Sequence, residues 1–309
     1  VWKLKYSAGV NWQLNRISYE DCSVDKKNTN TQWSINPTVQ VMMPFGSKMN
    51  HALMLSYKRT LSDIPYTAIS SIINWSDTYN YTVGNPDLKA QSADIVMAGL
   101  SLLRNKINLT ALYAHSHDRI YWQTFQNKVT PDVFYTKPVN INGQGVWGFG
   151  AEWMESPTKW WRFKLSGRIE ITPENTTLDG IHYNKTRFKE YFYFNNNFRF
   201  GHGWGGMLNV NFEPTYRTLD RTYHAVYNVN GQIYKTILGD NLQVALDFTP
   251  LGNRRKLDRQ AGANKVSYKY TTPVQYVGFS LTWNFSGGKK VDVNVVDGIQ
   301  DYHETKDNR

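Results

Sequence analysis

The sequence is poor in the residues that stabilise small secreted domains and metal centres. Its 309 residues include one cysteine, Cys22, so an internal disulfide and a cysteine-ligated metal site are both excluded. Proline is also scarce, with 11 residues. No apolar run reaches the roughly 20 residues that a transmembrane helix requires, which excludes a helical membrane protein. The first residues, VWKLK, are not a signal peptide, so we expect any export signal to lie outside this chain.

Basic residues are in excess but are not concentrated anywhere. The formal net charge of +10 and the pI of about 9.4 would suit a nucleic-acid binder, a membrane-surface protein or a protein among anionic lipid head groups. Clusters stay short, as in the NRRK segment at 253–256. A nucleic-acid site would concentrate such charges on one element. We therefore expect no nucleic-acid partner.

Aromatic residues, in contrast, are abundant. They make up 15% of the chain, with 11 Trp and 20 Tyr, which is high for a soluble enzyme. Many fall in segments where apolar and polar residues alternate strictly, most clearly over 2–14, 161–171 and 208–216. Alternation with a period of two predicts β-strands that have one apolar and one polar face.

The alternation predicts about twelve strands and no helix longer than two turns. The expected strands are 2–19, 31–43, 50–61, 91–103, 107–124, 134–154, 160–172, 186–200, 205–219, 221–236, 240–249 and 273–285. Tight turns alternate with longer connections, which we place at 20–30, 62–90, 125–133, 173–185 and 250–272. The connection between 219 and 221 is short and breaks this rule. Short turns on the periplasmic side and long loops outside the cell are typical of outer-membrane β-barrels.

We therefore predict an all-β fold, an antiparallel transmembrane β-barrel over residues 1–285, followed by a polar periplasmic tail over 286–309. In hydrocarbon every backbone N–H and C=O needs a partner, so a sheet crosses a bilayer only as a closed barrel. Leu165 and Val210 should then face lipid, and Ser166 and Asn211 should face the lumen. A soluble β-sandwich with one buried face in each sheet is the alternative.

Three segments near the end of the first third of the chain carry a family resemblance. LMLSYKRT at 53–60, DTYN at 77–80 and VGNPDLKAQ at 83–91 follow one another. Their order resembles the barrel of TonB-dependent outer-membrane receptors, which have a tyrosine strand, a long loop and a Gly-Asn-Pro-Asx-Leu-Lys-Pro-Glu segment. Ala90 and Gln91 stand where that family most often has Pro and Glu. Weaker likenesses at 113–120, 139–152 and 279–285 extend the resemblance over nearly the whole chain, which is most similar to the outer-membrane-protein β-barrel group common in gut Bacteroidetes.

The resemblance implies a nutrient receptor in the outer membrane of a Gram-negative bacterium. Such receptors have an N-terminal plug and a 22-stranded barrel, so this chain would be the C-terminal half of the barrel, surrounded by lipid. The TonB complex would act through a plug that is absent from this chain, to release a small ligand such as a glycan, a peptide or a metal chelate. A complete small barrel, a passive channel or porin, and a soluble carbohydrate-binding β-protein are the alternatives.

Residues 84–86, Gly84, Asn85 and Pro86, predict a rigid corner between a long loop and a strand. Pro86 fixes its own φ and keeps Asn85 out of the helical region, while Gly84 can supply a positive φ. Turn chemistry explains these residue types, so we expect a structural role for them and not a ligand contact.

The expected ligand-binding residues are aromatic side chains in or near the long connections. Aromatic rings there can stack on a sugar or another planar or apolar ligand. The candidates are Trp75, Tyr79, Trp122, Phe134 and Tyr135. Each of them could instead belong to the girdle of aromatic residues that anchors a barrel at the membrane interface.

The sequence offers little catalytic or metal-binding chemistry. His115 and His117 would share one face of a strand and could bind a metal or heme, but no third ligand stands near them. No Gly-x-Ser-x-Gly, His-Glu-x-x-His or phosphate-loop motif occurs. We expect no enzymatic activity, no metal site and no cofactor.

Overall fold

The computed structural model describes residues 4–21, 26–141, 143–178, 181–239, 241–251, 254–261, 264–271 and 276–285. Cys22 and the predicted tail over 286–309 lie outside these ranges. Within them the chain forms one large sheet and two small ones, and neighbouring strands of the large sheet are antiparallel throughout. No helix of this part of the chain could cross a membrane, and its α-helix has four residues.

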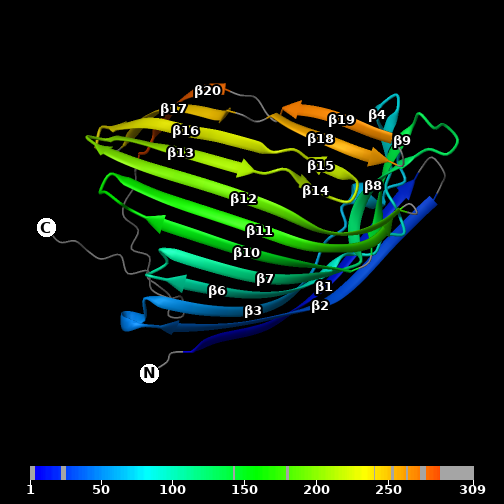
Figure 1. The fold of residues 1–309 in the computed structure, drawn as a ribbon, viewed down its shortest axis with the longest axis horizontal. Coiled ribbons are helices and arrows are strands. Elements are labelled where there is room, and N and C mark those ends of the chain that lie inside the picture. Colours follow the sequence, from blue (N-terminus) through cyan, green and yellow to red (C-terminus); the bar gives the residue numbers. More distant parts are fainter. Residues whose placement is uncertain are drawn as a thin grey trace.

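The large sheet has twelve strands and is strongly curved (Figure 1). In order across the sheet they are β1 Lys5–Asp21, β2 Lys26–Phe45, β3 His51–Leu61, β6 Ser92–Leu102, β7 Ile107–His117, β10 Gln144–Glu155, β11 Trp161–Leu178, β12 Ile181–Gly201, β13 Trp204–Glu213, β16 Val226–Ile237, β17 Leu242–Leu251 and β20 Tyr276–Trp283. Among the described residues, β1 and β20 each pair with one neighbour only, so they are the edges of an open sheet.

The two small sheets lie at one end of the large one, on the right in Figure 1. The second sheet has the order β4 Asn74–Asp77, β5 Asn80–Thr82, β9 Phe134–Ile141 and β8 Arg119–Gln126. The third has the order β14 Tyr216–Arg217, β15 Arg221–Tyr223, β18 Arg254–Ala261 and β19 Asn264–Thr271. The helices are α1, Tyr66–Ile69, and a 3-10 turn, η1, Ser47–Met49.

Several predicted strands are divided between sheets. The segment 107–124 breaks after His117, where Asp118 has a φ of 50°, and continues as β8 in the second sheet. The segment 134–154 breaks at Gly143, where a Cβ would lie 2.8 Å from the His115 ring. The segment 205–219 breaks at Pro214, which has no N–H for the ladder. The segment 221–236 likewise becomes β15 and β16.

The predicted connections at 20–30 and 173–185 are wrong, because in the structure the strands continue through most of both segments. Strands β11 and β12 pair without a break from Trp161↔Phe198 to Leu178↔Ile181. Strands β1 and β2 likewise pair as far as Asp21↔Lys26. The polar residues in these segments suggested loops, but both faces of a strand can be polar where the sheet extends beyond the apolar region. The predicted connection at 250–272 contains β18 and β19.

The large sheet separates an apolar face from a polar face. One row of neighbours across nine strands runs Met43, Leu53, Leu100, Leu109, Ala151, Gly167, Phe192, Phe212, Tyr227. The row beside it, on the other face, runs Ser101, Asn108, Glu152, Ser166, Tyr193, Asn211, Asn228. Leu165 and Val210 therefore share the apolar face, and Ser166 and Asn211 the polar one, as expected.

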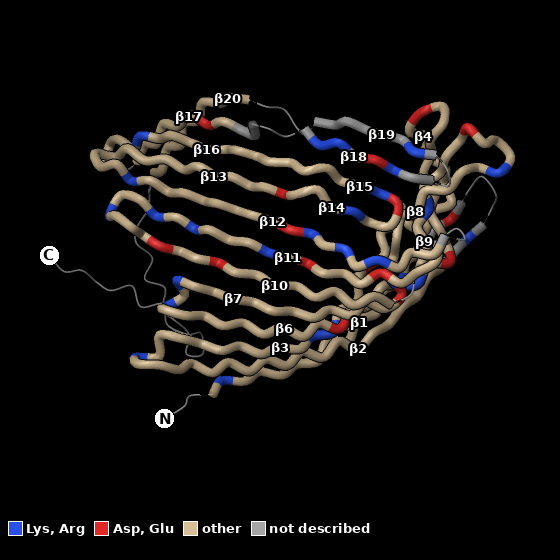
Figure 2. Tube along the Cα trace, in the orientation of Figure 1, with Lys and Arg blue, Asp and Glu red and all other residues tan. Residues whose placement is uncertain are grey.

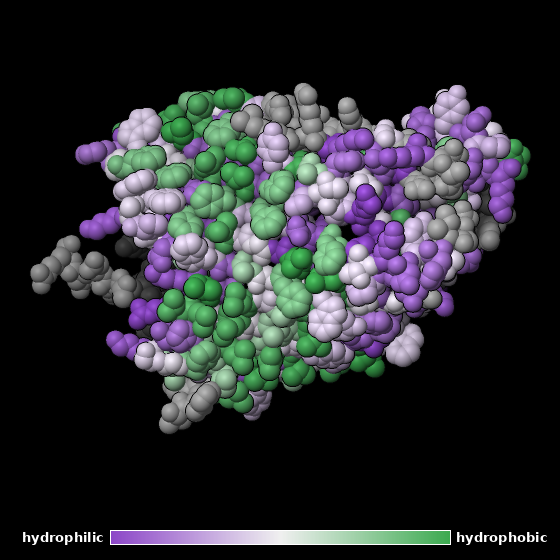
Figure 3. All heavy atoms as spheres, viewed as in Figure 1, coloured by the Kyte–Doolittle hydropathy of each residue, from purple (hydrophilic) through white to green (hydrophobic). Residues whose placement is uncertain are grey.

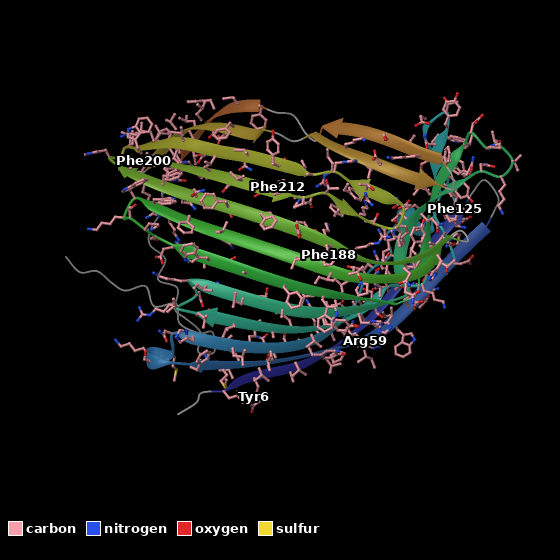
Figure 4. All side chains as sticks on the ribbon, in the orientation of Figure 1. Tyr6, Arg59, Phe125, Phe188, Phe200 and Phe212 are labelled. Carbon is pink, nitrogen blue, oxygen red and sulfur yellow. The ribbon has the colours of Figure 1, made fainter. Side chains whose placement is uncertain are left out.

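The apolar face is exposed to the surroundings of the protein. The side chains of Val10 and Phe279 are 72% exposed, and Phe188 and Phe212, labelled in Figure 4, are also exposed. Figure 3 shows apolar residues over the strands and hydrophilic ones over the end that carries the small sheets. A water-soluble protein rarely leaves so large an apolar surface uncovered. The pattern is the one that a lipid-facing surface requires.

The connections at the two ends of the large sheet differ in length. The short turns lie on the left in Figure 1 and use left-handed backbone conformations, such as Asn105 (φ 66°) and Gly239 (φ 63°). Aromatic rings gather beside them: Trp160 contacts Trp161, Phe198 and Phe200, with ring centroids 6.1–6.4 Å apart (Phe200 is labelled in Figure 4). Aromatic residues near strand ends are typical of a membrane interface.

The long connections fold over the polar face. Asp63, after β3, accepts a hydrogen bond of 3.0 Å from the Gln13 side chain and another from Asn15, both on the polar face of β1. The Asn30 amide of β2 donates to the carbonyl of Leu88 at 3.0 Å. A buried cluster of Ile64, Ala68, Ile69 and Leu88 packs there against Ile17 of β1. The polar face is thus the interior of the curved sheet, closed over at this end by folded loops.

Candidate ligand-binding site at the long-connection end

The Gly-Asn-Pro corner fixes the first long connection to itself. The backbone N–H of Gly84 donates to the carbonyl of Ser70 at 2.8 Å, and that of Asn85 donates to Ala68 at 2.7 Å. A Cβ on Gly84 would overlap the Ser70 carbonyl and lie 2.7 Å from the Ser70 nitrogen. Gly84 does not have the positive φ that the sequence suggested. Glycine is needed because another backbone segment approaches it closely.

The same corner joins the first long connection to the second sheet. Pro86 is the second residue of a turn closed by Leu88 N–H donating to Asn85 C=O at 3.2 Å. The Asn85 side chain donates to the carbonyl of Pro138 on β9 at 3.0 Å. Asn140, two residues further on, accepts from Lys89 N–H at 2.9 Å and donates to Lys89 C=O at 3.0 Å. These bonds tie the corner to β9 and hold it in place.

An aromatic ladder crosses all four strands of the second sheet. Trp75 on β4 contacts Tyr81 on β5 (ring centroids 4.8 Å apart), and Tyr81 stacks on Tyr135 of β9 at 5.4 Å. Tyr135 also stacks on Phe125 of β8 at 5.2 Å, with 20° between the ring planes. The strand register places these four residues opposite one another. Figure 4 shows Phe125 at this end of the molecule.

The structure brings together two of the five predicted ligand-binding residues, Trp75 and Tyr135. Trp122 points to the other face of β8 and packs against the buried cluster around α1. Tyr79 is 57% exposed in the turn between β4 and β5, where its carbonyl accepts from Phe134 N–H at 2.7 Å. Phe134 itself is half-buried at the start of β9.

Two members of the ladder, Tyr81 and Phe125, were not predicted. Alternation along β8 places Phe125 on the opposite face from Trp122, and alternation along β9 places Tyr135 on the opposite face from Phe134. This pattern could have indicated that Phe125 and Tyr135 share one face. The pairing of β5 with β9 is parallel and joins segments about fifty residues apart, and no local pattern encodes it. The neighbouring amides of Asn80 and Asn127 are engaged in turns, with Asp77 and with the Val129 N–H respectively.

A buried junction joins the second sheet to the third. The hydroxyl of Tyr121, on the ladder face of β8, donates to the carboxylate of Asp220 and accepts from Asp220 N–H at 3.3 Å. Burial, followed by the nearby Asp220 charge, raises the pKa of Tyr121 above its ordinary value. Arg221 pairs with Asp220 at 3.4 Å and donates to the carbonyl of Trp122 at 2.6 Å. The phenol therefore remains a proton donor near neutral pH.

A second set of ion pairs joins the small sheets to the wall of the large one. Glu174, on the polar face of β11, is 3% exposed and lies 3.3 Å from Arg119 of β8 and 3.4 Å from Arg187 of β12. Arg187 also donates to the carbonyl of Thr218, next to β14. Breaking one partner of such a buried set leaves an uncompensated charge. The loops are thereby held in one arrangement over the interior.

Two cavities lie beside this junction. The larger, of ≈ 480 Å³, lies between β12 and the third sheet, which includes β15. The smaller, of ≈ 310 Å³, lies over the inner wall formed by β10, β11 and β12. Arg187, Arg217, Thr218 and Leu219 line both of them. Figure 2 shows the mixture of Lys, Arg, Asp and Glu at this end of the molecule. The site is thus a folded vestibule with one aromatic and one charged compartment.

The two strand histidines do not form a metal centre within the described chain. His117 lies 3.0 Å from Asp94, which also accepts a hydrogen bond of 2.8 Å from the Tyr57 hydroxyl. The rings of His115 and His117 meet edge to face at 4.7 Å. In the ranges that the structure covers, no group of three His, Cys, Asp or Glu side chains could hold a metal ion.

Comparison with known proteins identifies the fold. Residues 1–283 match the outer membrane protein beta-barrel family. The chain belongs to this family. It is also similar in structure to the siderophore receptor PirA from Pseudomonas aeruginosa, with a TM-score of 0.53 and 10% sequence identity over 92% of this chain and 49% of that receptor. A search of curated protein sequences found no match.

Membership of this family places the protein in the outer membrane of a Gram-negative bacterium, with the apolar face of the large sheet in lipid. The soluble carbohydrate-binding alternative is therefore wrong. At 10% identity the likeness to the siderophore receptor concerns the fold alone. The chain spans about half the length of that receptor.

Proposed function

We propose that the chain forms part of the barrel of an energised, TonB-dependent receptor that takes up a nutrient across the outer membrane. The observation that supports this most directly is the vestibule: the long connections fold over the polar interior and present an ordered aromatic ladder and two cavities. The motif at 83–91, which resembles that of such receptors, fixes the loops that build it. Both the family and the structural neighbour favour a transport role without enzymatic activity.

The open edges of the large sheet support a larger barrel. Backbone groups at the edges of β1 and β20 need partners in hydrocarbon. We propose that further strands of the full-length protein supply them, and that a plug domain inside the barrel couples the receptor to the TonB complex. The likeness to 49% of the length of a siderophore receptor fits this arrangement.

The ligand would bind first at the aromatic ladder. Stacked rings offer planar apolar surface with polar hydroxyl edges, which suits a sugar ring or another planar group. Trp75 is 58% exposed, so its ring is accessible from solution. We retain Tyr79, Trp122 and Phe134 as weaker candidates, because their rings lie outside the ladder.

A passive channel is the competing function, and energy dependence separates the two. A strain lacking the gene should lose growth on, or uptake of, one class of nutrient in a substrate screen. A proton-motive-force uncoupler should abolish the same uptake in the wild-type strain. Uptake that continues in uncoupled cells, together with ion conductance of the purified protein in planar bilayers, would establish the channel instead.

Matched variants test the ladder directly. Replacing Trp75 by Ala and Phe125 by Leu removes both ends of the ladder, and we expect uptake to fall at least tenfold at limiting substrate. Replacing Trp160 by Ala and Phe200 by Leu makes the same change at the short turns and should leave uptake nearly unchanged. Equal uptake by both variants, at equal surface expression, would remove the ladder from the ligand site.

Labelling of intact cells tests the orientation. Val129, in the loop between β8 and β9, is 91% exposed, and Asn105 lies in a short turn between β6 and β7. We expect Val129→Cys to react with an impermeant maleimide on intact cells and Asn105→Cys to react only after the outer membrane is opened. The reverse result would place the vestibule in the periplasm.

A further inference from the structure

The larger cavity of the vestibule has an excess of positive charge. Its lining includes six Lys and Arg side chains and two Asp side chains. The cations come from separate elements. Lys185 and Arg187 belong to β12, Arg217 belongs to β14, and the others belong to further strands of the third sheet, including β15. A concave, partly desolvated site lined mainly by one sign of charge attracts ligands of the opposite sign.

The acidic groups of the cavity are already engaged by other partners. Asp220 pairs with Arg221 and accepts from the Tyr121 hydroxyl. Asp258 accepts from Ser267 at 2.7 Å and lies 3.1 Å from His224 and 3.2 Å from Lys265. The Oδ2 atom of Asp220 has no hydrogen-bond partner, but two carboxylates do not balance the six cations of the lining.

Glu174, which borders the smaller cavity, is also engaged. It is shared by Arg119 and Arg187. Each buried carboxylate in this region therefore has at least one basic partner. The basic residues engaged in these pairs are Arg119, Arg187, Arg221 and Lys265.

Arg259 also makes an interaction within the structure. The other two cations of the lining, Lys185 and Arg217, are exposed and have no counter-charge among the described residues. Within the ranges that the structure describes, the side chains of Lys185 and Arg217 make no ion pair and no hydrogen bond. Both line the larger cavity, and Arg217 lines the smaller one as well. A guanidinium group can bind an oxyanion through two parallel hydrogen bonds, and an ammonium group adds a second positive charge.

We propose that the larger cavity binds an oxyanion group of the transported molecule, a carboxylate, sulfate or phosphate, through Arg217 and Lys185. This inference rests on the proposed receptor function and specifies its substrate class. The cavity volume of ≈ 480 Å³ admits a substituted ring that carries several such groups. The ligand is then an acidic molecule and not a neutral one.

The spacing of the two compartments suits one extended ligand. Phe125 of the ladder and Tyr121 of the junction lie on the same face of β8, four residues apart, or roughly 13 Å along the strand. Tyr121 contacts Asp220, which lines the larger cavity. A molecule with a planar or sugar-like part and an acidic group about 10–15 Å away could contact both compartments, by the same strand geometry.

The test uses purified full-length protein in detergent and four named probes: sulfate, citrate, myo-inositol hexakisphosphate and uncharged myo-inositol. Binding is measured by calorimetry at constant ionic strength. The first variant combines Arg217→Gln and Lys185→Gln. Its control combines Lys128→Gln and Lys27→Gln, which remove the same charge from exposed positions outside both cavities.

We expect at least one of the three anions to bind the wild-type protein and myo-inositol not to bind. The cavity variant should weaken that binding about tenfold or more, and the control variant less than twofold, with both still folded by circular dichroism. The anion that binds most tightly distinguishes carboxylate, sulfate and phosphate. Absence of anion binding, or equal weakening in both variants, would overturn the inference.

The outcome is independent of the uptake experiment. If deletion of the gene abolishes energised uptake but no anion binds the cavity, the receptor function stands and the acidic substrate class is wrong. If an anion binds through Arg217 and Lys185 but deletion changes no uptake, the cavity is an anion site and the receptor function is wrong.

Discussion

The membrane-spanning part of the large sheet and the vestibule at its end are encoded in different ways. In the spanning part, two adjacent rows of side chains, one apolar and one polar, repeat from strand to strand, and many similar residues could replace one another. In the vestibule, single residues such as Gly84, Asn140 and Tyr121 each make contacts that few other residues could make. The first region is specified by a pattern and the second by particular side chains. Substitutions should therefore act differently in the two regions.

The largest effect is expected where the pattern is reversed in the spanning part. Leu165 lies four residues into β11 from Trp161 at the short turns, on the apolar face. Leu165→Arg places a charge in hydrocarbon and should cost about 2–4 kcal/mol of unfolding free energy near the midplane. Val210→Arg on β13 should behave in the same way. Unfolding by urea in lipid vesicles measures both.

The adjacent positions on the polar face are the controls. Ser166→Arg and Asn211→Arg introduce the same side chain into the interior, where water and polar groups surround it. We expect less than about 1 kcal/mol for each, because surface-like polar positions tolerate substitution. If the two faces respond equally, the assignment of lipid and lumen faces is incorrect.

The next largest effect concerns a single glycine in the vestibule. Gly84→Ala would force its new Cβ against the backbone of Ser70 and Ala68, and we expect a loss of about 1–3 kcal/mol. The loss should be local, seen as faster hydrogen exchange in 62–90 and in β8–β9, while the large sheet stays protected. Gly9→Ala is the control, because nothing lies within 4 Å of its Cβ. Equal hydrogen exchange in the two variants would show that the close approach of another backbone segment is not the reason for glycine at Gly84.

The sequence predicts the spanning part well because its physics is local. Alternation along a strand can be recognised without reference to distant residues. The twelve strands and the lipid-facing Leu165 and Val210 therefore follow from a period of two. The boundaries failed where polar hairpins extended strands β11 and β12 and where Asp118, Gly143 and Pro214 passed the chain from one sheet to another. These breaks depend on single residues within otherwise regular patterns.

The vestibule is less predictable because its contacts join distant segments. Tyr121 and Asp220 are 99 residues apart, and Asn85 and Pro138 are 53 apart. The aromatic composition indicated Trp75 and Tyr135, but the parallel pairing that adds Tyr81 to their ladder follows from tertiary structure alone. The Gly-Asn-Pro motif indicated a rigid corner and could not indicate its partners.

A smaller effect is expected from the junction between the two small sheets. Tyr121→Phe removes a hydroxyl and leaves the buried Asp220 carboxylate with one donor fewer, at a cost of about 1–2 kcal/mol to local stability. Tyr79→Phe, in an exposed turn, is the control and should change nothing measurable. Hydrogen exchange of β8 and β15 reports the difference, and similar protection in both variants would contradict the role of this contact.

The same junction predicts a dependence on pH. The pKa of Tyr121 is raised in the folded protein, so its stabilising effect is complete below the ordinary tyrosine pKa of about 10 and is lost as the pH rises above that value. In the wild-type protein we expect the hydrogen-exchange protection of β8 to fall as the pH rises above about 10. The fall should exceed the general effect of alkali on exchange. In Tyr121→Phe this extra loss should be absent.

The smallest effect is expected within the aromatic ladder, and it tests whether the vestibule is a set of cooperating contacts. Tyr81 and Tyr135 stack with 12° between their ring planes on neighbouring parallel strands. A double-mutant cycle with Tyr81→Ala and Tyr135→Ala should give a coupling of about 0.5–1.5 kcal/mol in the opening free energy of β9 amides. The pair Trp75 and Phe125, at opposite ends of the ladder, should give a coupling near zero, because their rings are separated by both tyrosines. A coupling between the ends as large as that between neighbours would mean that the ladder orders as one unit, and binding of a ligand at Trp75 would then be felt at Phe125 and along β8 toward the charged cavity.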